Sequence, residues 1–152
     1  MIRLALLTAL LVAPGGAAGC MSSTPPGASG DWVELSADGL PAAIASRCAL
    51  AAKRGKKPFV YLHASWCGPC RAIESTRRQD PAMRAAFARA TILAVDIDRL
   101  PAATLEKLGL GARAIPVFFR MTAAGKPTGE KIDGGAWGEN SPKDLDAPGP
   151  AL

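Results

Sequence analysis

The sequence predicts an α/β fold with a mixed central sheet, in which a parallel βαβ half is followed by an antiparallel hairpin and helices flank the sheet. Three observations predict it. The chain has 152 residues, of which 49% are apolar, which is enough for one ordinary core. Through its middle, strand-like segments alternate with segments of helical periodicity, a pattern typical of parallel strands. The last two strand-like segments are joined by the short turn "AAGKPT".

The first half of the domain contains two strands and the helix that joins them. Residues 31–35 predict a short strand at the edge of a sheet. Residues 58–64 ("PFVYLHA") form a continuous apolar run, which is typical of a strand buried on both faces. A helix between them ends at Gly55. Its apolar positions recur at helical spacing: Leu40, Ile44, Cys48 and Ala51 or Ala52.

The second half continues the alternation. A helix begins within the segment "CGPC" and runs to about Arg78, and another begins with Asp80 as its N-cap and Pro81 at the first helical position. Residues 91–98 ("TILAVDID") predict a second buried strand. The remaining elements are a helix at 101–110, closed by glycines, and a hairpin of strands at 116–122 and 129–135.

The N-terminal segment differs from this core. Residues 1–19 carry Arg3, then an apolar run and small residues, which predicts a secretory signal peptide too short to span a bilayer. The segment "AAGC" ending in Cys20 resembles the lipobox of bacterial lipoproteins, in which the cysteine is lipidated and becomes the first residue of the mature chain. Ala17 departs from the leucine most common there. Ordinary secretion and an uncleaved anchor are the alternatives.

Two further segments flank the domain that we expect at 31–137. Residues 21–30 ("MSSTPPGASG") have the composition of a flexible tether and extend at most roughly 35 Å. A lipid on Cys20 would hold the domain near a membrane surface. Residues 138–152 contain three prolines and few apolar side chains, which predicts an irregular tail.

The charge balance narrows the function classes. The net charge is +5, and no arginine-rich stripe with interleaved aromatic residues occurs, so nucleic-acid binding is not supported. The one basic cluster is "KRGKK" at residues 53–57. It is either a solvated helix end or a point of attachment to anionic headgroups.

Cys67 and Cys70 form a CxxC pair directly after a strand and at the start of a helix, which is the setting for redox chemistry. At a helix N-terminus, unpaired N–H groups and the helix dipole favour a negative charge, so Cys67 is expected to be the reactive thiolate. Cys70 lies one turn further on and more shielded. Pro69 fits the first turn, and Gly68 leaves the approach to the sulfur open.

Two other interpretations of the pair are weaker. A structural zinc ion takes four ligands, and only Cys48 and His63 remain besides Cys20, so no metal is expected. A purely structural disulfide closing so small a ring would constrain the unfolded chain little. The sequence indicates no cofactor.

The motifs "SWCGPC" and "GARAIPVFF", with the spacing between them and the closing "KIDGG", resemble the thioredoxin family over about Asp31 to Trp137. The segment "CRAIESTRRQDPAMRAAF" is more similar to the periplasmic C-terminal domain of membrane thiol–disulfide interchange reductases. Those domains similarly carry a glutamate four residues after the second cysteine, followed by an Asp-Pro helix start. The resemblance implies a thioredoxin fold.

The resemblance also implies a mechanism. Thiolate Cys67 attacks a partner disulfide, and Cys70 resolves the mixed disulfide. Pro116 is expected to be cis, which places the backbone of Ile115 beside Cys67, although the sequence alone also allows Pro116 simply to start a strand. Trp66 would belong to the docking rim. The expected substrate-contacting residues are Trp66, Gly68, Pro69, Ile115 and Pro116.

This sequence departs from the family at the position of a buried aspartate and its companion lysine, which are Tyr61 and Ala94 here. Glu74 is the candidate substitute as proton acceptor for Cys70, because i and i+4 lie on one helix face. Alternatively, Glu74 pairs on a wet surface with an arginine: Arg71, Arg77 or Arg78. His63 either packs half-exposed or tunes the thiolate.

Two further expectations concern packing. Thioredoxins close with an amphipathic helix, and the tail here is too short and rich in proline to supply it fully, so a sheet face is left for a partner or for the tail itself. Cys48, at an apolar position of a helix, is expected to be an inert buried thiol. If it were exposed, it could instead pair between chains.

Together these features predict a lipid-anchored, periplasmic thiol–disulfide oxidoreductase that reduces disulfide-containing proteins and receives electrons from a membrane thiol transporter. The Gly-Pro dipeptide between the cysteines resembles reducing thioredoxins. A disulfide oxidant or isomerase is one alternative. A non-enzymatic binding or adaptor module that uses the thiols or the docking groove is another.

Overall fold

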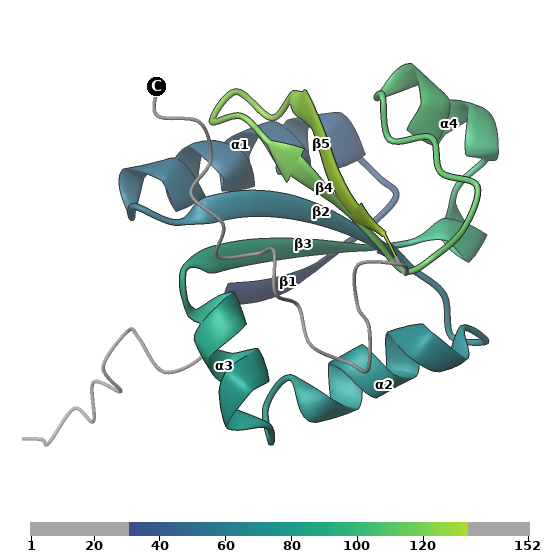
Figure 1. Cartoon of the computed structure of the whole chain (residues 1–152). Coiled ribbons are helices and arrows are strands. Elements are labelled where there is room, and N and C mark those ends of the chain that lie inside the picture. Colours follow the sequence, from purple (N-terminus) through teal and green to yellow (C-terminus); the bar gives the residue numbers. More distant parts are fainter. Residues whose placement is uncertain (1–30, 134–152) are drawn as a thin grey trace, which may run out of the picture.

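The computed structural model describes residues 31–133 (Figure 1). The predicted signal peptide, the cysteine predicted to be lipidated, the predicted tether and the predicted tail lie outside these residues, as does the predicted end of the domain at Trp137. No helix in the described range is long and apolar enough to cross a membrane.

The centre of the fold is a five-stranded sheet with the order β1-β3-β2-β4-β5. The first three neighbours, β1, β3 and β2, are parallel, whereas β2–β4 and β4–β5 are antiparallel, so the predicted mixed sheet is confirmed. The predicted edge strand, β1, does lie at the edge. The strands are β1 (Asp31–Leu35), β2 (Lys57–His63), β3 (Ala90–Asp96), β4 (Val117–Met121) and β5 (Pro127–Asp133).

Helices cover both faces of the sheet, and each face has its own apolar core. In Figure 1, α2 and α3 lie below the sheet and α1 lies above it. The cysteine pair packs with Ile73 and Phe87 on the α2/α3 face, and Leu40 and Leu105 pack on the other face. The helices are α1 (Leu40–Lys53), α2 (Gly68–Thr76), α3 (Pro81–Ala88) and α4 (Ala102–Lys107).

Side-chain hydrogen bonds set the ends of several elements. The predicted N-cap of α3 is confirmed, because the Asp80 carboxylate accepts a hydrogen bond from the Met83 N–H at 3.0 Å. The strand predicted to reach residue 98 ends at Asp96, whose carboxylate accepts from the Asp98 N–H at 3.0 Å and starts a 3₁₀ turn, η1 (Ile97–Arg99). That turn brings Asp98 to the site described next.

One tight contact fixes the hairpin against α1. Gly125, in the β4–β5 turn, has φ +75°, and a Cβ atom built on it would lie 2.7 Å from the Cα of Ala45. Any side chain there would have to displace the helix backbone.

The parallel strands all point the same way, so the carboxyl ends of β2 and β3, at His63 and Asp96, meet at one end of the sheet. The cysteine motif follows β2 at this end, and β4 starts there with Val117, directly after Pro116. The topology therefore gathers three chain segments around Cys67.

Candidate active site

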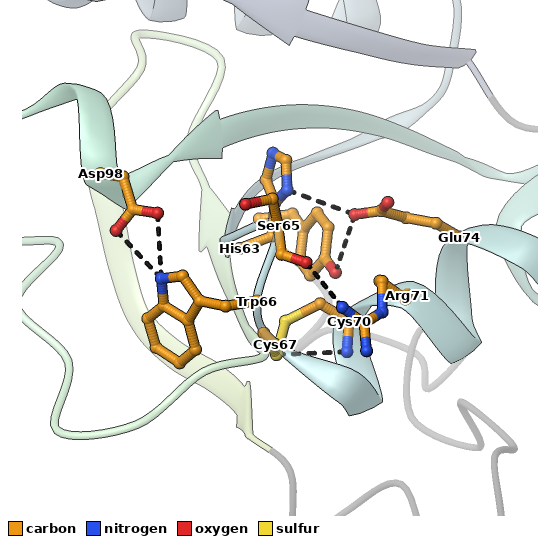
Figure 2. The surroundings of a disulfide bond; sticks show 9 residues. His63, Ser65, Trp66, Cys67, Cys70, Arg71, Glu74 and Asp98 are labelled. Atoms are coloured by element: carbon orange, nitrogen blue, oxygen red, sulfur yellow. Dashed lines mark hydrogen bonds and ion pairs between the residues drawn. A yellow bond between two sulfur atoms is a disulfide. The ribbon is translucent and has the colours of Figure 1, made fainter.

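The Cys67–Cys70 pair is joined as a disulfide, with an S–S distance of 2.08 Å and a Cα–Cα distance of 5.3 Å. Cys67 is the N-cap of α2, and its sulfur accepts a hydrogen bond from the Cys70 N–H at 3.2 Å (Figure 2). Pro69 lies in the first turn, where no intrahelical donor is lost. The predicted placement of both cysteines is confirmed, with Cys67 4% exposed and Cys70 completely buried.

The loop that carries Cys67 is fastened on both sides. The Cys67 N–H donates to the carbonyl of Ala64 at 3.1 Å, at the end of β2. Arg71, on the first turn of α2, reaches back and donates from Nη1 to the Ser65 carbonyl at 2.9 Å (Figure 2). The sulfur is therefore held in position by its own strand and its own helix.

A shallow apolar hollow of about 290 Å³ lies beside the disulfide loop. The Ile115–Pro116 peptide bond is cis, as the resemblance implied, and Pro116 is buried whereas Ile115 is half-buried. A Cβ placed on Gly68 would meet nothing within 4 Å, which agrees with an open approach. The residues that line the hollow are Trp66, Ile97, Ala112, Arg113, Ala114 and Ile115.

Trp66 is the most exposed large apolar residue described, at 62%. Its indole Nε1 donates to the carboxylate of Asp98, at 2.9 Å to Oδ2 and 3.2 Å to Oδ1 (Figure 2). The sequence analysis missed Asp98, because it placed that residue inside a strand. The sequence did hold a signal for Asp98, because this residue ends a predicted strand, and the carboxyl ends of parallel strands meet at one edge of the sheet. The hydrogen bond holds an exposed ring at the rim of the hollow.

Behind the disulfide, the two positions at which the family has an aspartate and a lysine are directly opposite each other, as Tyr61↔Ala94 on β2 and β3. Both residues are completely buried, and Tyr61 belongs to the same core as the two cysteines. Burial and the nearby charge of Glu74 raise the pKa of the Tyr61 hydroxyl far above its ordinary value, so it stays a neutral donor.

The Tyr61 hydroxyl donates to Oε1 of Glu74 at 3.5 Å. Nδ1 of His63 lies 3.2 Å from the same oxygen (Figure 2). These contacts do not include an arginine, although the charge of Glu74 also acts on Arg77, one of the three arginines expected as its partner. The described contacts do not join Glu74 to Cys70 either. The carboxylate turns inward and belongs to a cluster with Tyr61 and His63.

His63 joins this cluster to β1. Its side chain is 13% exposed, its ring stacks on Tyr61 with centroids 5.2 Å apart, and its Nε2 lies 3.3 Å from Oε2 of Glu34. Nε2 is not aligned for a hydrogen bond, so the contact with Glu34 acts by charge. His63 thus packs, as one expectation held, and also lies between two carboxylates, which sequence spacing did not reveal.

The charges of the cluster shift two pKa values. Burial by itself lowers the pKa of His63, but the contact with Glu34 and its charge, with the further charges of Glu74 and Asp96, outweigh burial and raise that pKa. The pKa of Glu34 is lowered, chiefly by His63 and against the effect of burial. His63 and Glu34 therefore stabilise each other as an ion pair.

Arg77 and Trp32 also lie near the Glu34 carboxylate. The Arg77 guanidinium lies 4.3 Å from the ring centroid of Trp32, and the indole of Trp32 donates to Glu34 at 3.0 Å. Burial lowers the pKa of Arg77, and its charge also contributes to the lowered pKa of Glu34.

Cys48 lies away from this site, on α1, and is completely buried. Burial raises the pKa of its thiol to about 11. The expected burial of this thiol is confirmed, and the exposure needed for a bond between chains is absent. Within residues 31–133, no group of three or more histidine, cysteine or acidic side chains could hold a metal ion.

Comparisons with known proteins agree with this geometry. The model of a family described as thioredoxin-like matches residues 40–123. A search of the curated proteins gives no match.

Among solved structures, the long form of spinach chloroplast thioredoxin f has a TM-score of 0.51 and 19% identity, with 73% of this chain and 81% of that chain covered. Poplar thioredoxin h gives a TM-score of 0.49 and 18% identity, with 68% and 83% covered. Thioredoxin O1 from Arabidopsis thaliana, in its oxidised state, gives 0.48 and 21%, with 68% and 86% covered. These matches do not single out the membrane reductase domains that the sequence also resembles.

Proposed function

The chain belongs to the thioredoxin-like family, and we propose that it is a thiol–disulfide oxidoreductase that reduces disulfides of extracytoplasmic proteins. The observation that carries this proposal is the position of Cys67 at the N-cap of α2, with its sulfur accepting the Cys70 N–H. A thiolate formed at that sulfur is stabilised by the N–H group and the helix dipole.

The reaction is a two-step exchange. The Cys67 thiolate attacks one sulfur of the substrate disulfide, a new S–S bond forms, and the released substrate thiolate takes a proton. Cys70 then loses its proton and attacks Cys67, so that the Cys67–Cys70 disulfide forms and the second substrate thiol leaves. Two electrons and two protons pass to the substrate, and a membrane thiol donor restores the dithiol.

Glu74 is the proposed acceptor of the Cys70 proton. Its carboxylate contacts Tyr61, which packs in the same core as both cysteines. His63, at 3.2 Å, holds the carboxylate in that position. Tyr61 occupies the position at which the family has a buried aspartate, and in this proposal the neighbouring Glu74 supplies the base that speeds resolution of the mixed disulfide.

The substrate chain is proposed to lie over the apolar hollow. Trp66 and Ile115 line it on two sides, and Gly68 leaves the sulfur of Cys67 open to approach. Pro69 and Pro116 shape the two loops on either side of the sulfur. An extended peptide beside a disulfide is the kind of ligand that such a hollow fits.

The cellular setting is part of the proposal. Residues 1–19 have the pattern of a signal peptide, and Cys20 that of a lipidated cysteine, so we place the enzyme on the periplasmic side of a bacterial membrane. In that oxidising compartment a reductase requires a membrane thiol-transporting donor. The likeness to periplasmic domains of membrane thiol–disulfide interchange reductases supports this partner.

The reduction potential of the Cys67–Cys70 pair tests the proposal. The full chain is equilibrated in thiol buffers, and the reduced fraction is counted by mass after thiol alkylation. A value near that of thioredoxin, about −270 mV, supports a reductase, whereas a value near about −120 mV identifies an oxidant and overturns the proposed direction. The absence of a two-electron transition would point to an adaptor.

A further inference from the structure

The end of the sheet opposite the active site has a distinct composition. The parallel strands β1, β2 and β3 all begin there, as their registers Asp31↔Thr91 and Lys57↔Ala90 require. The starts of β2 and β3 are tied by a hydrogen bond from the Lys57 N–H to the Arg89 carbonyl at 2.8 Å. Helix α1 runs back against the strands and ends at this same place with Lys53 (Figure 1).

Four basic side chains gather at this end, and we call them the basic end: Arg47, Lys53, Arg54 and Lys56. Within the described segments that form it, Asp31 is the acidic residue. Its carboxylate lies 3.1 Å from Nζ of Lys56 and 3.5 Å from Nη1 of Arg54. These four cations outnumber this one carboxylate, so the basic end keeps a net positive charge.

An apolar side chain lies among these cations. Leu50 is 37% exposed and follows Arg47 by three residues and precedes Arg54 by four, so the three share one face of α1. They line a hollow of about 300 Å³ between α1 and β1. Cations around an exposed leucine form the surface that binds at the boundary between headgroups and acyl chains.

The chain reaches the active domain from this end. Asp31 begins β1, and ten residues, 21–30, separate it from Cys20. Even fully extended they span only roughly 35 Å. A lipid on Cys20 would therefore keep the start of β1, and with it the basic end, within this distance of the membrane.

We propose that the basic end docks on an anionic phospholipid surface, and that the Cys67–Cys70 end thereby faces the aqueous compartment. This inference rests on the lipid anchor proposed above. Anionic headgroups match the sign of the patch, and the short tether keeps the patch close to them, where salt screening over about 8 Å still permits attraction. The orientation leaves the hollow beside Trp66 free for soluble substrates.

Lysine footprinting of the full, lipidated chain tests the docking. The protein is reconstituted into vesicles of phosphatidylethanolamine alone or with a quarter of phosphatidylglycerol, and an amine-reactive reagent labels it briefly. Labelling of Lys53 is compared with that of Lys107 on α4. We expect the labelling rate of Lys53 to fall at least fivefold on the anionic vesicles and that of Lys107 to stay constant. Salt at about 0.5 M should restore the labelling rate of Lys53, because it screens the attraction.

Charge-reversed variants make the test specific. Arg47→Glu with Arg54→Glu is expected to abolish the protection of Lys53. Arg78 and Arg99 are two exposed arginines outside the basic end. Arg78→Glu with Arg99→Glu changes the net charge equally, and we expect this variant to preserve the protection of Lys53. Equal labelling of Lys53 on both vesicles, or protection of Lys107 instead, would overturn the docking.

Two readouts on the same samples separate this inference from the proposed function. The mass of the Cys20 peptide reports the lipid, and reduction of a protein disulfide reports the enzyme. Unprotected Lys53 in a lipidated, active sample rejects the docking and leaves the function standing. A sample without lipid and without protection rejects both the anchor and the docking.

Discussion

Glu74 on α2 and His63 at the end of β2 lie 3.2 Å apart, measured from carboxylate Oε1 to imidazole Nδ1, and the opposite ring nitrogen of His63 faces Glu34 of β1 at 3.3 Å. The imidazole thus lies between carboxylates from two elements, next to the core that holds the disulfide. The same ring cannot satisfy both carboxylates when it is neutral. This relationship makes the cluster dependent on pH.

The first prediction concerns stability. The pKa of His63 is raised in the folded state by Glu34, Glu74 and Asp96 against the effect of burial. Its contribution is therefore complete below the unfolded pKa, about 6.5, and is lost as the pH rises through the folded pKa. We expect His63→Asn to lower the free energy of unfolding by roughly 1–2 kcal/mol in mildly acidic solution, and by less at alkaline pH, in denaturant titrations.

Glu34 sets the acidic limit of the pH window in which the contact between His63 and Glu34 stabilises the fold. Its pKa is lowered in the folded state, so its contribution is present above the ordinary value and is lost as the pH falls through the folded pKa. The loss caused by His63→Asn should be greatest in mildly acidic solution, between these limits. Glu106→Gln, on the exposed surface of α4, is the control. A loss for His63→Asn that is the same inside this window as on either side of it would contradict the ion pair.

The second prediction concerns resolution of the mixed disulfide. If Glu74 accepts the Cys70 proton, Glu74→Gln slows this step by about 10²-fold or more, because general base catalysis contributes that much. The attack by Cys67 should be little affected. Rapid quenching by acid during reduction of a protein substrate would show the mixed disulfide accumulate.

Two variants separate catalysis from packing in this experiment. Tyr61→Phe removes the hydroxyl that contacts Glu74 at 3.5 Å and keeps the carboxylate, so resolution should remain near the wild-type rate. A normal resolution rate in Glu74→Gln would assign the carboxylate to structure.

Much of the fold could be predicted from the sequence because its signals are local. The apolar run at 58–64, the Asp80 N-cap and the glycine-closed turns each act within a few residues, and the elements appear close to where these signals place them. The end of β3 was misplaced by two residues, since Asp96 and Asp98 continue an alternating pattern. A side-chain cap at Asp96 ends the strand instead.

The candidate site was predicted in part, and for a similar reason. Cys67, Cys70 and the cis bond before Pro116 belong to contiguous motifs. The partners of His63 and Trp66 do not, because Glu34 and Asp98 come from other strands or turns and meet them only through the parallel register. Spacing along one helix suggested Cys70 or an arginine for Glu74, whereas the neighbouring strand supplied its contacts.

The third prediction distinguishes an enzyme from an adaptor. Cys70→Ser leaves Cys67 able to attack but removes the resolving thiol, so a covalent complex with a protein substrate should persist. Non-reducing electrophoresis would show it, and a reductant would release it. Cys67→Ser is the matched control and should form little complex, because Cys70 is completely buried. Substrate binding of equal strength in both variants without a covalent complex would favour the adaptor.

The fourth prediction concerns substrate docking. The Asp98 carboxylate fixes the exposed Trp66 ring through a hydrogen bond of 2.9 Å. Asp98→Ala frees the ring, and loss of about 1 kcal/mol of positioning corresponds to a KM about fivefold higher for a protein disulfide, with kcat little changed. Asp98→Asn keeps an acceptor and should recover most of the affinity. A small disulfide that does not reach the hollow should react equally with all three proteins.

The fifth prediction concerns Cys48. Its thiol is completely buried on α1 and has a pKa raised to about 11, so only about one molecule in a thousand carries the thiolate at pH 8. Alkylation by iodoacetamide, read from the mass of the Cys48 peptide, should therefore follow global unfolding.

Stability measurements on two variants complete this test. Cys48→Ser places a hydroxyl in an apolar core and should lower the free energy of unfolding by about 1–3 kcal/mol. Cys48→Ala adds no polar group and should cost less. Rapid alkylation of the native protein, or the reverse order of the two variants, would show that the thiol opens to water and belongs among the reactive cysteines.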